Sequence, residues 1–193
     1  MSTLEKSRPP ILNRLLAALP PKEYQRLRPH LEPATLTPKQ VLYREGASAE
    51  SVWFPQQGMI SLVSVLESGR AIEIGIVGSE GMVGTATFMG GQAPCEAMVQ
   101  LAGSALRMKA DVLSREFKRG GALQGLLLHY AQALYVQVSQ TAACNGSHKL
   151  DKRLARWLLM THDRAGADKI ELTQEFIAIM LASITLQDAG LIN

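Results

Sequence analysis

The hydrophobic pattern of the chain changes once, near Met108, and this change constrains the fold more than any other feature. Between about Thr37 and Met108, short runs rich in Val, Ile and aromatic residues end in glycine or a polar turn, as at Gly46, Gly58 and Gly69. Strands this short, spaced by about ten residues, are typical of a β-sandwich, barrel or roll and not of a parallel α/β sheet.

Two parts of this region carry more detailed expectations. Ile72, Ile74 and Ile76 alternate strictly, so their side chains are expected to face one core. The segment 97–108 predicts two further strands that meet around Gly103. The region as a whole predicts a compact all-β unit.

The flanks of the β region are helical. Residues 11–19 have apolar residues at helical spacing, and Pro20 and Pro21 open a second short helix. After Met108, residues 110–119 predict one helix, and residues 120–145 predict a long one. Its apolar positions step by three, four or seven and form a seam, interrupted by Gln137: Leu123, Leu127, Tyr130, Leu134 and Thr141. We predict that this seam is a dimer interface; a purely intramolecular core helix is the alternative.

The C-terminal part predicts a small helical domain. Asn145-Gly146-Ser147 is expected to break the long helix, and an amphipathic helix follows from His148. Its expected inward side is Leu150, Leu154, Trp157, Leu158 and Thr161, and its expected outward basic side is Lys149, Lys152, Arg153 and Arg156. The predicted domains are residues 1–119, the β unit with its helical lead-in; residues 120–145, a dimerisation helix; and residues 146–193, the small helical domain.

Composition and motifs exclude several classes of protein. Hydrophobic residues make up 47% of the 193 residues and charged residues 19%, which permits a buried core; the net charge of +3 is compatible with nucleic acid but is not evidence for it. The N-terminus has no signal-peptide core and no apolar run reaches a membrane span, so we expect a cytoplasmic protein without a membrane partner. No catalytic motif, zinc spacing or paired-carboxylate signature is present, so neither an enzyme nor a metal site is expected.

The end of the chain, LTQEFIAIMLASITLQDAGLIN, has features of a helix-turn-helix. Thr173 is placed to cap a helix, small Ala178 lies inside it, and Gly190 is placed to end a later one. The amides at such a helix start can bind a phosphate, so Lys169, Thr173 and Gln174 are predicted DNA contacts.

Together these features resemble the CRP/FNR superfamily of transcriptional regulators. The resemblance runs from about Leu15 to Asn193, and its most specific parts are Gly46, Gly58, the GSEGMVG turn, LTQEFIA and AGLI. It implies an α+β fold: a cyclic-nucleotide-binding-like β-roll of jelly-roll type, a long dimerisation helix and a winged helix-turn-helix. It also implies a homodimer that binds DNA, contacts RNA polymerase and is switched by a small-molecule effector.

The predicted effector pocket departs from the family pattern. Members that bind cyclic AMP resemble one another in a GE-L turn, whose Glu holds the ribose, and an R-S/T-A segment, whose Arg pairs with the phosphate. At those places this chain has Gly81-Met82-Val83 and Cys95-Glu96-Ala97. Met82 cannot accept the ribose bond and Glu96 would repel the phosphate, so cyclic AMP is not expected and no cofactor is predicted. Two cysteines cannot supply an iron–sulfur cluster; haem through His129 or Cys95 is a weaker alternative.

The predicted helix-turn-helix is also short. Only the four residues Ala182–Thr185 separate its first helix from the LQDAGLI tail, roughly nine fewer than a turn and a recognition helix need. Either the natural protein has residues here that this sequence lacks, or the recognition helix has been lost. We favour the first, because both flanks keep the residues that the motif requires. The alternative function is a ligand-binding or protein-interaction module with a C-terminal domain that does not read DNA.

Overall fold

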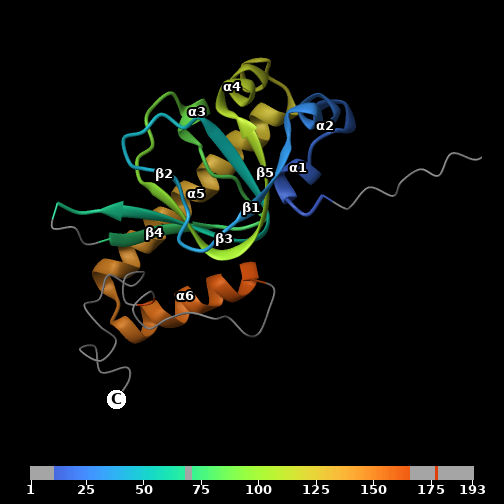
Figure 1. Ribbon diagram of the computed structural model, residues 1–193. Coiled ribbons are helices and arrows are strands. Elements are labelled where there is room, and N and C mark those ends of the chain that lie inside the picture. The colour runs from blue at the N-terminus through green and yellow to red at the C-terminus, as the bar shows by residue number, and fades with distance from the viewer. Residues whose placement is uncertain (1–10, 68–70, 166–176, 178–193) are drawn as a thin grey trace, which may run out of the picture.

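The computed structural model describes residues 11–67, 71–165 and 177. Within these residues, a helical lead-in precedes an antiparallel β-roll, and two long helices follow it (Figure 1). In chain order the elements are α1 (Arg14–Ala17), α2 (Pro21–Leu27), the short 3₁₀ helix η1 (Arg28–His30), β1 (Glu32–Leu36), β2 (Val41–Tyr43), β3 (Ser51–Val65), β4 (Ala71–Val77), α3 (Ala86–Met89), β5 (Glu96–Lys109), α4 (Ala110–Lys118), α5 (Ala122–Ser147) and α6 (Leu150–Ala165). The predicted α+β class with an antiparallel roll is confirmed.

The two lead-in helices begin at residues that favour a helix start. The side chain of Asn13 caps α1 by accepting a hydrogen bond from the backbone N–H of Leu16 at 3.1 Å. Pro21 is the first residue of α2, where its missing N–H costs nothing. The predicted lead-in is confirmed, although α1 is shorter than residues 11–19.

The sheet has the strand order β1-β5-β3-β4, with β2 also paired to β5. The expectation of separate strands on either side of Gly58 and Gly103 was wrong, because β3 and β5 run through these glycines without turning. Gly58 has a φ of +85° at a register shift, and a Cβ on Gly103 would lie 2.1 Å from the carbonyl oxygen of Gln57. These glycines bend two long strands and let their backbones approach closely, which a turn glycine does not do.

Strand β4 does not alternate as expected. Ile74 packs against the core inside the roll, whereas Ile76 pairs with Ser61 and lies on the opposite face, the one that also carries the buried Glu73. The three isoleucines therefore do not share one face, and that prediction was wrong. A register shift between Leu62 and Val63 of β3 accounts for this, because Leu62 pairs with Gly75 and Val63 pairs with Glu73. The bulge changes which positions face the roll and brings a carboxyl group beneath α6.

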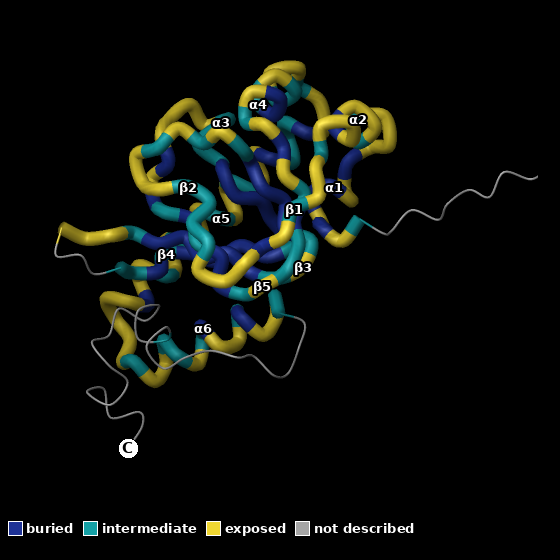
Figure 2. Tube along the Cα trace, viewed as in Figure 1, coloured by how far each residue is buried: buried dark blue, intermediate teal, exposed yellow. Residues whose placement is uncertain are grey.

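Two large apolar cores, and a small cluster around Val63 and Trp157 beneath α6, hold the described residues together (Figure 2). One joins the lead-in helices, α4 and the first half of α5 to the sheet, with Leu16, Phe54, Met82, Leu113 and Leu127 among its members. The second fills the inside of the roll. Figure 1 shows α5 crossing behind the roll and α6 lying below it.

The long helix continues through the predicted breaker Asn145-Gly146 and ends at Ser147. In α6 the predicted inward residues Trp157 and Thr161 are buried, whereas the prediction for Leu158 was wrong, because it is 42% exposed. No described helix is long and apolar enough to cross a membrane.

The basic residues of the last helix lie on two sides of it. Lys149, just before α6, and Lys152 are exposed, as predicted. Arg153 and Arg156 are partly buried and line a small cavity against β4 and α5, so their predicted outward position was wrong. Their guanidinium groups therefore belong to the contact between α6 and the roll.

Candidate functional site

The GSEGMVG segment, residues 78–84, is a loop that connects β4 to α3 and contacts both β3 and α5. The backbone N–H of Gly81 donates to the carbonyl oxygen of Gly78 at 3.1 Å, which closes a turn. Val83 pairs with Trp53 through two backbone hydrogen bonds of 2.8 and 3.0 Å. The loop is therefore fixed to the sheet at Val83, and Gly81 contacts residues outside the sheet.

Asn13 fixes this loop from the lead-in side. Its side-chain amide Nδ2 donates to the carbonyl oxygens of Gly81 at 2.8 Å and Pro55 at 2.9 Å, and the residue is completely buried. This role was not predicted from the sequence. The capping preference of Asn before a helix could have drawn attention to it, but not to its distant partners.

Tyr130 of α5 closes over the same loop. Its hydroxyl donates to the carbonyl oxygen of Met82 at 2.8 Å. A Cβ on Gly81 would lie 2.5 Å from both Cε2 and the hydroxyl oxygen of Tyr130, so only glycine fits beneath the ring. Burial raises the pKa of Tyr130 well above its usual range, so the phenol stays protonated and can donate at neutral pH. The loop and the long helix are thus in direct, close-packed contact.

The six predicted effector-pocket residues do not form one surface. Val83, Cys95 and Ala97 are brought together, but as buried members of the core inside the roll. Met82 is buried in the other core, and Gly81 lies against Tyr130. Glu96 points away from this core, as the alternation of β5 requires, and pairs with the exposed Arg44 at 3.3 Å.

The interior of the roll at this point is apolar and uncharged. Burial raises the pKa of the Cys95 thiol to about 11, with Glu45 adding to the effect. Tyr43 packs against the same core, and burial raises its pKa above its usual range, as does the neighbouring Cys95. Both groups are therefore neutral near pH 7, and neither offers a positive charge to a phosphate.

A large pocket lies between the lead-in helices and strands β1 and β5. Its volume is about 1040 Å³, and mostly apolar residues line it, including Leu16, Tyr24, Ala34 and Leu106, with Arg28 among the polar ones. None of the six predicted pocket residues borders it.

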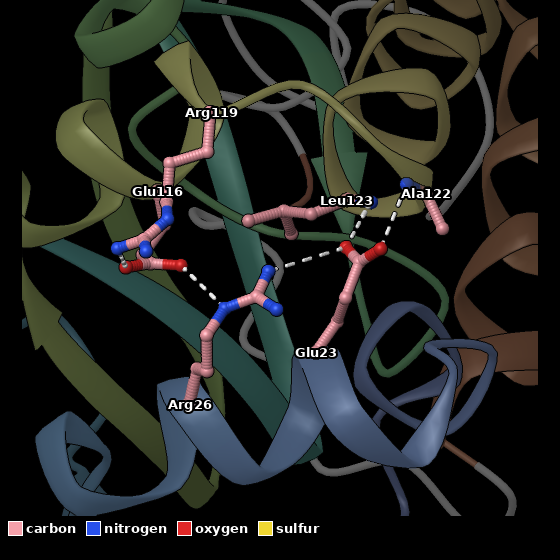
Figure 3. Close-up of polar contacts among 6 residues, drawn as sticks. All are labelled: Glu23, Arg26, Glu116, Arg119, Ala122 and Leu123. Carbon is pink, nitrogen blue, oxygen red and sulfur yellow. Dashed lines mark hydrogen bonds and ion pairs between the residues drawn. The ribbon is translucent and has the colours of Figure 1, made fainter.

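The start of α5 is capped by a carboxylate from α2 (Figure 3). The backbone N–H groups of Ala122 and Leu123 donate to Glu23 at 3.0 and 2.8 Å. These two hydrogen bonds are the main reason that the pKa of Glu23 is lowered, with Arg26 adding to the effect. Gly121 lacks a capping side chain, and a Cβ there would lie 2.9 Å from the Glu23 carboxylate. The glycine therefore allows the lead-in to fix the beginning of the long helix.

The five residues of the predicted dimer seam face mainly inward. Leu123 and Leu127 are buried in the protomer's own core, and Tyr130 and Leu134 pack against the two cores. Thr141 is partly buried and donates to the carbonyl oxygen of Gln137. The apolar residues that α5 leaves exposed are others: Leu128, Tyr135 and Val136, which are 52%, 68% and 56% exposed.

Polar contacts between described residues attach helix α6 to the roll. The indole N–H of Trp157 donates to the buried carboxyl group of Glu73 at 2.8 Å. Arg164 donates to Glu80, in the loop of residues 78–84, at 2.7 Å. The roll therefore meets both α5 and α6 through β4 and the loop that follows it.

The remaining predicted positions are the DNA contacts and the haem ligands. Lys169, Thr173 and Gln174 lie outside the described residues. For the haem alternative, His129 is exposed on α5 and Cys95 is buried. Within residues 11–67 and 71–165, no group of three or more His, Cys, Asp or Glu side chains is arranged to hold a metal ion.

Comparison with known proteins agrees with this architecture. Residues 33–119, from β1 to just beyond α4, match the model of the cyclic nucleotide-binding domain. This part of the chain is therefore similar to that domain family. Among curated proteins, none matches the chain by sequence.

Solved structures extend the likeness beyond the roll. CLP of Xanthomonas campestris, described as a c-di-GMP-responsive global regulator, is 13% identical with a TM-score of 0.71, covering 88% of this chain and 87% of that one. A putative CRP/FNR-family transcriptional regulator from Eubacterium rectale is 14% identical, with a TM-score of 0.72 and coverages of 92% and 83%. A CRP-family transcriptional regulator from Thermus thermophilus is 18% identical, with a TM-score of 0.65 and coverages of 81% and 80%. The chain has the fold of these CRP/FNR regulators.

Proposed function

We propose that this protein is a cytoplasmic, homodimeric, DNA-binding transcriptional regulator of the CRP/FNR type. The observation that carries the proposal is the continuous contact from the roll to both later helices, through Tyr130 on α5 and Trp157 on α6. A change in the conformation of the loop of residues 78–84 would alter the contacts that position both helices. The fold shared with solved regulators supports this reading, and RNA polymerase is a further proposed partner.

The proposed dimer interface is the exposed apolar stripe of α5. Leu128, Tyr135 and Val136, with Gln132 and Ser139, recur at steps of three or four residues on one side of the helix. Exposed apolar residues at this spacing are typical of a helix that packs on a second copy. The predicted seam residues pack within their own protomer. We therefore place the dimer interface on the neighbouring, exposed side of α5.

The dimer proposal can be tested by light scattering. Wild type should have twice the monomer mass of 21.0 kDa, and Val136→Glu should shift it toward the monomer. Met89→Glu is the matched control, because Met89 is 66% exposed but lies on α3. A wild-type mass of one chain, or equal masses for all three proteins, would contradict the interface.

We propose that the roll does not respond to cyclic AMP. A cyclic phosphate needs a cation and several hydrogen-bond donors, whereas Val83, Cys95 and Ala97 form a packed apolar core at the corresponding place. The same argument applies to the dianionic c-di-GMP to which CLP is said to respond. Calorimetric titration with each nucleotide should give no binding heat; saturable binding at micromolar concentration would overturn the proposal.

The DNA-binding part of the proposal rests on the C-terminal helices. Lys169, Thr173 and Gln174 are proposed to contact phosphates, and the exposed Lys149 and Lys152 are proposed to add positive charge to the DNA-binding surface. A gel-shift series with genomic fragments at increasing salt tests this. Affinity should fall steeply with salt, because each phosphate contact releases counterions. Absence of any shift at low salt favours the alternative, a module that acts through protein partners.

A further inference from the structure

A buried carboxyl group joins the roll to α6. Glu73 of β4 is only 6% exposed and lies beneath the helix. Trp157 donates its indole N–H to Oε1 at 2.8 Å, and the hydroxyl oxygen of Ser61 on β3 lies 2.6 Å from Oε2. Since Trp157 can only donate and Glu73 is fixed to the sheet, this pair holds the middle of α6 against the roll.

Counting hydrogens links the protonation state of Glu73 to the orientation of Ser61 and Gln100. The Ser61 hydroxyl oxygen also lies 2.6 Å from Oε1 of Gln100 on β5, and a hydroxyl has one hydrogen to donate. If Ser61 donates to Gln100, then Glu73 must carry a proton and donate to Ser61. Among the described residues, Nε2 of Gln100 is buried without a hydrogen-bond partner. Loss of the proton therefore requires Ser61 to turn and the Gln100 amide to rotate by half a turn.

Among the described residues, the charged groups around Glu73 are cations. Arg153, Arg156 and Arg164 of α6 face this region, α5 contributes the Cys144 thiol, and β3 contributes the neutral Ser61. Arg164 is held by Glu80 at 2.7 Å, and Arg156 donates to Thr141 at 3.3 Å. Burial raises the pKa of Glu73 to about 8, against the opposing effects of the Ser61 and Trp157 hydrogen bonds and of Arg164 and Arg156.

The structure leaves little room for an ionised form. A cavity of about 30 Å³ borders Glu73, Cys144, Arg153 and Trp157, which is enough for about one or two water molecules. A carboxylate needs more hydration than this, so ionisation favours conformations in which α6 moves away and water reaches Glu73.

We propose that Glu73 is a proton-operated latch that docks α6 on the roll when it is protonated and releases α6 when it loses its proton. The inference rests on the proposed function in one respect: α6 is taken as the first helix of the DNA-binding domain. The regulated quantity is then the position of that domain relative to the dimer helix, and the signal is the proton itself.

Tryptophan emission of the full chain, followed from about pH 6 to pH 9.5, tests the latch, because Trp157 becomes solvated when α6 leaves the roll. Wild type should show a red shift with a midpoint near pH 8, and Glu73→Gln, which keeps the shape and stays neutral, should show none. Trp157→Phe should lose the signal, and Glu96→Gln, at an exposed ion pair, should keep it. An unchanged transition in Glu73→Gln, or none in wild type, overturns the proposal.

A second variant and a DNA-binding measurement complete the test. If Glu73→Gln does not fold, Ser61→Ala replaces it: removing the hydroxyl that bonds Oε2 should move the midpoint, and an unmoved midpoint overturns the latch. DNA affinity is then measured over the same pH range. A Glu73-dependent fluorescence transition without DNA binding at any pH contradicts the proposed function but supports the latch. DNA binding with a flat fluorescence titration contradicts the latch alone.

Discussion

Replacing Tyr130 by Phe tests whether the long helix and the 78–84 loop are energetically joined. The variant keeps the ring over Gly81 and removes only the hydroxyl that donates to the Met82 carbonyl at 2.8 Å. Met82 is completely buried, so its carbonyl oxygen loses a partner that water cannot easily replace. Leaving such a group unpaired costs about 1–3 kcal/mol of the free energy of unfolding.

Thermal and urea denaturation measure this cost. For a chain of this size, the loss corresponds to a decrease in Tm of roughly 2–10 °C. Tyr135→Phe is the matched control, because Tyr135 lies on the same helix but is 68% exposed, and its Tm should change by less than about 1 °C. Equal Tm values for the two variants would refute the role assigned to Tyr130.

Three further predictions concern single residues. Glu23→Ala removes the cap from α5 and should lower the free energy of unfolding by about 1 kcal/mol at pH 7. Because the pKa of Glu23 is lowered in the folded state, this difference from wild type should disappear as the pH falls below the usual pKa range of a glutamate. Urea titrations at each pH measure it. Gly81→Ala forces Tyr130 aside and should cost more than Tyr130→Phe in the same assay, whereas Gly90→Ala, at a glycine with open space around it, should show only the cost of its positive φ. Glu73→Gln should become more stable relative to wild type as pH rises from 4.5 to 8, by up to about 5 kcal/mol, because wild type alone must keep a proton on a buried carboxyl; a constant difference across that range contradicts the burial argument.

The roll could be predicted from the sequence because its evidence is local. Short β-rich runs and frequent glycines indicate antiparallel strands, and the structure has them. The number of strands could not be predicted at Gly58 and Gly103, because a glycine that ends a strand and one that bends it look the same in sequence. Only the contact between Gly103 and Gln57, from two different strands, distinguishes these cases.

The candidate site depended on contacts that sequence spacing does not contain. The predicted seam of α5 has helical spacing, but the helix is apolar on more than one side, so spacing could not say that Leu127 faces the roll while Leu128 faces outward. Glu73 stands between isoleucines in an alternating strand and would be expected to face solvent. Its burial follows from a bulge at the adjacent Ile74, which shows only in the pairing of β4 with β3, and from the docking of Trp157, which is distant in sequence.

Selection of bound genomic fragments followed by sequencing tests the central claim most directly. A homodimeric regulator should enrich a two-fold symmetric sequence whose half-sites are separated by about one turn of DNA, or a multiple of it. Val136→Glu should lose this enrichment, and Met89→Glu should retain it. Fragments without a shared sequence, or a single unsymmetric site bound equally well by both variants, would contradict the account.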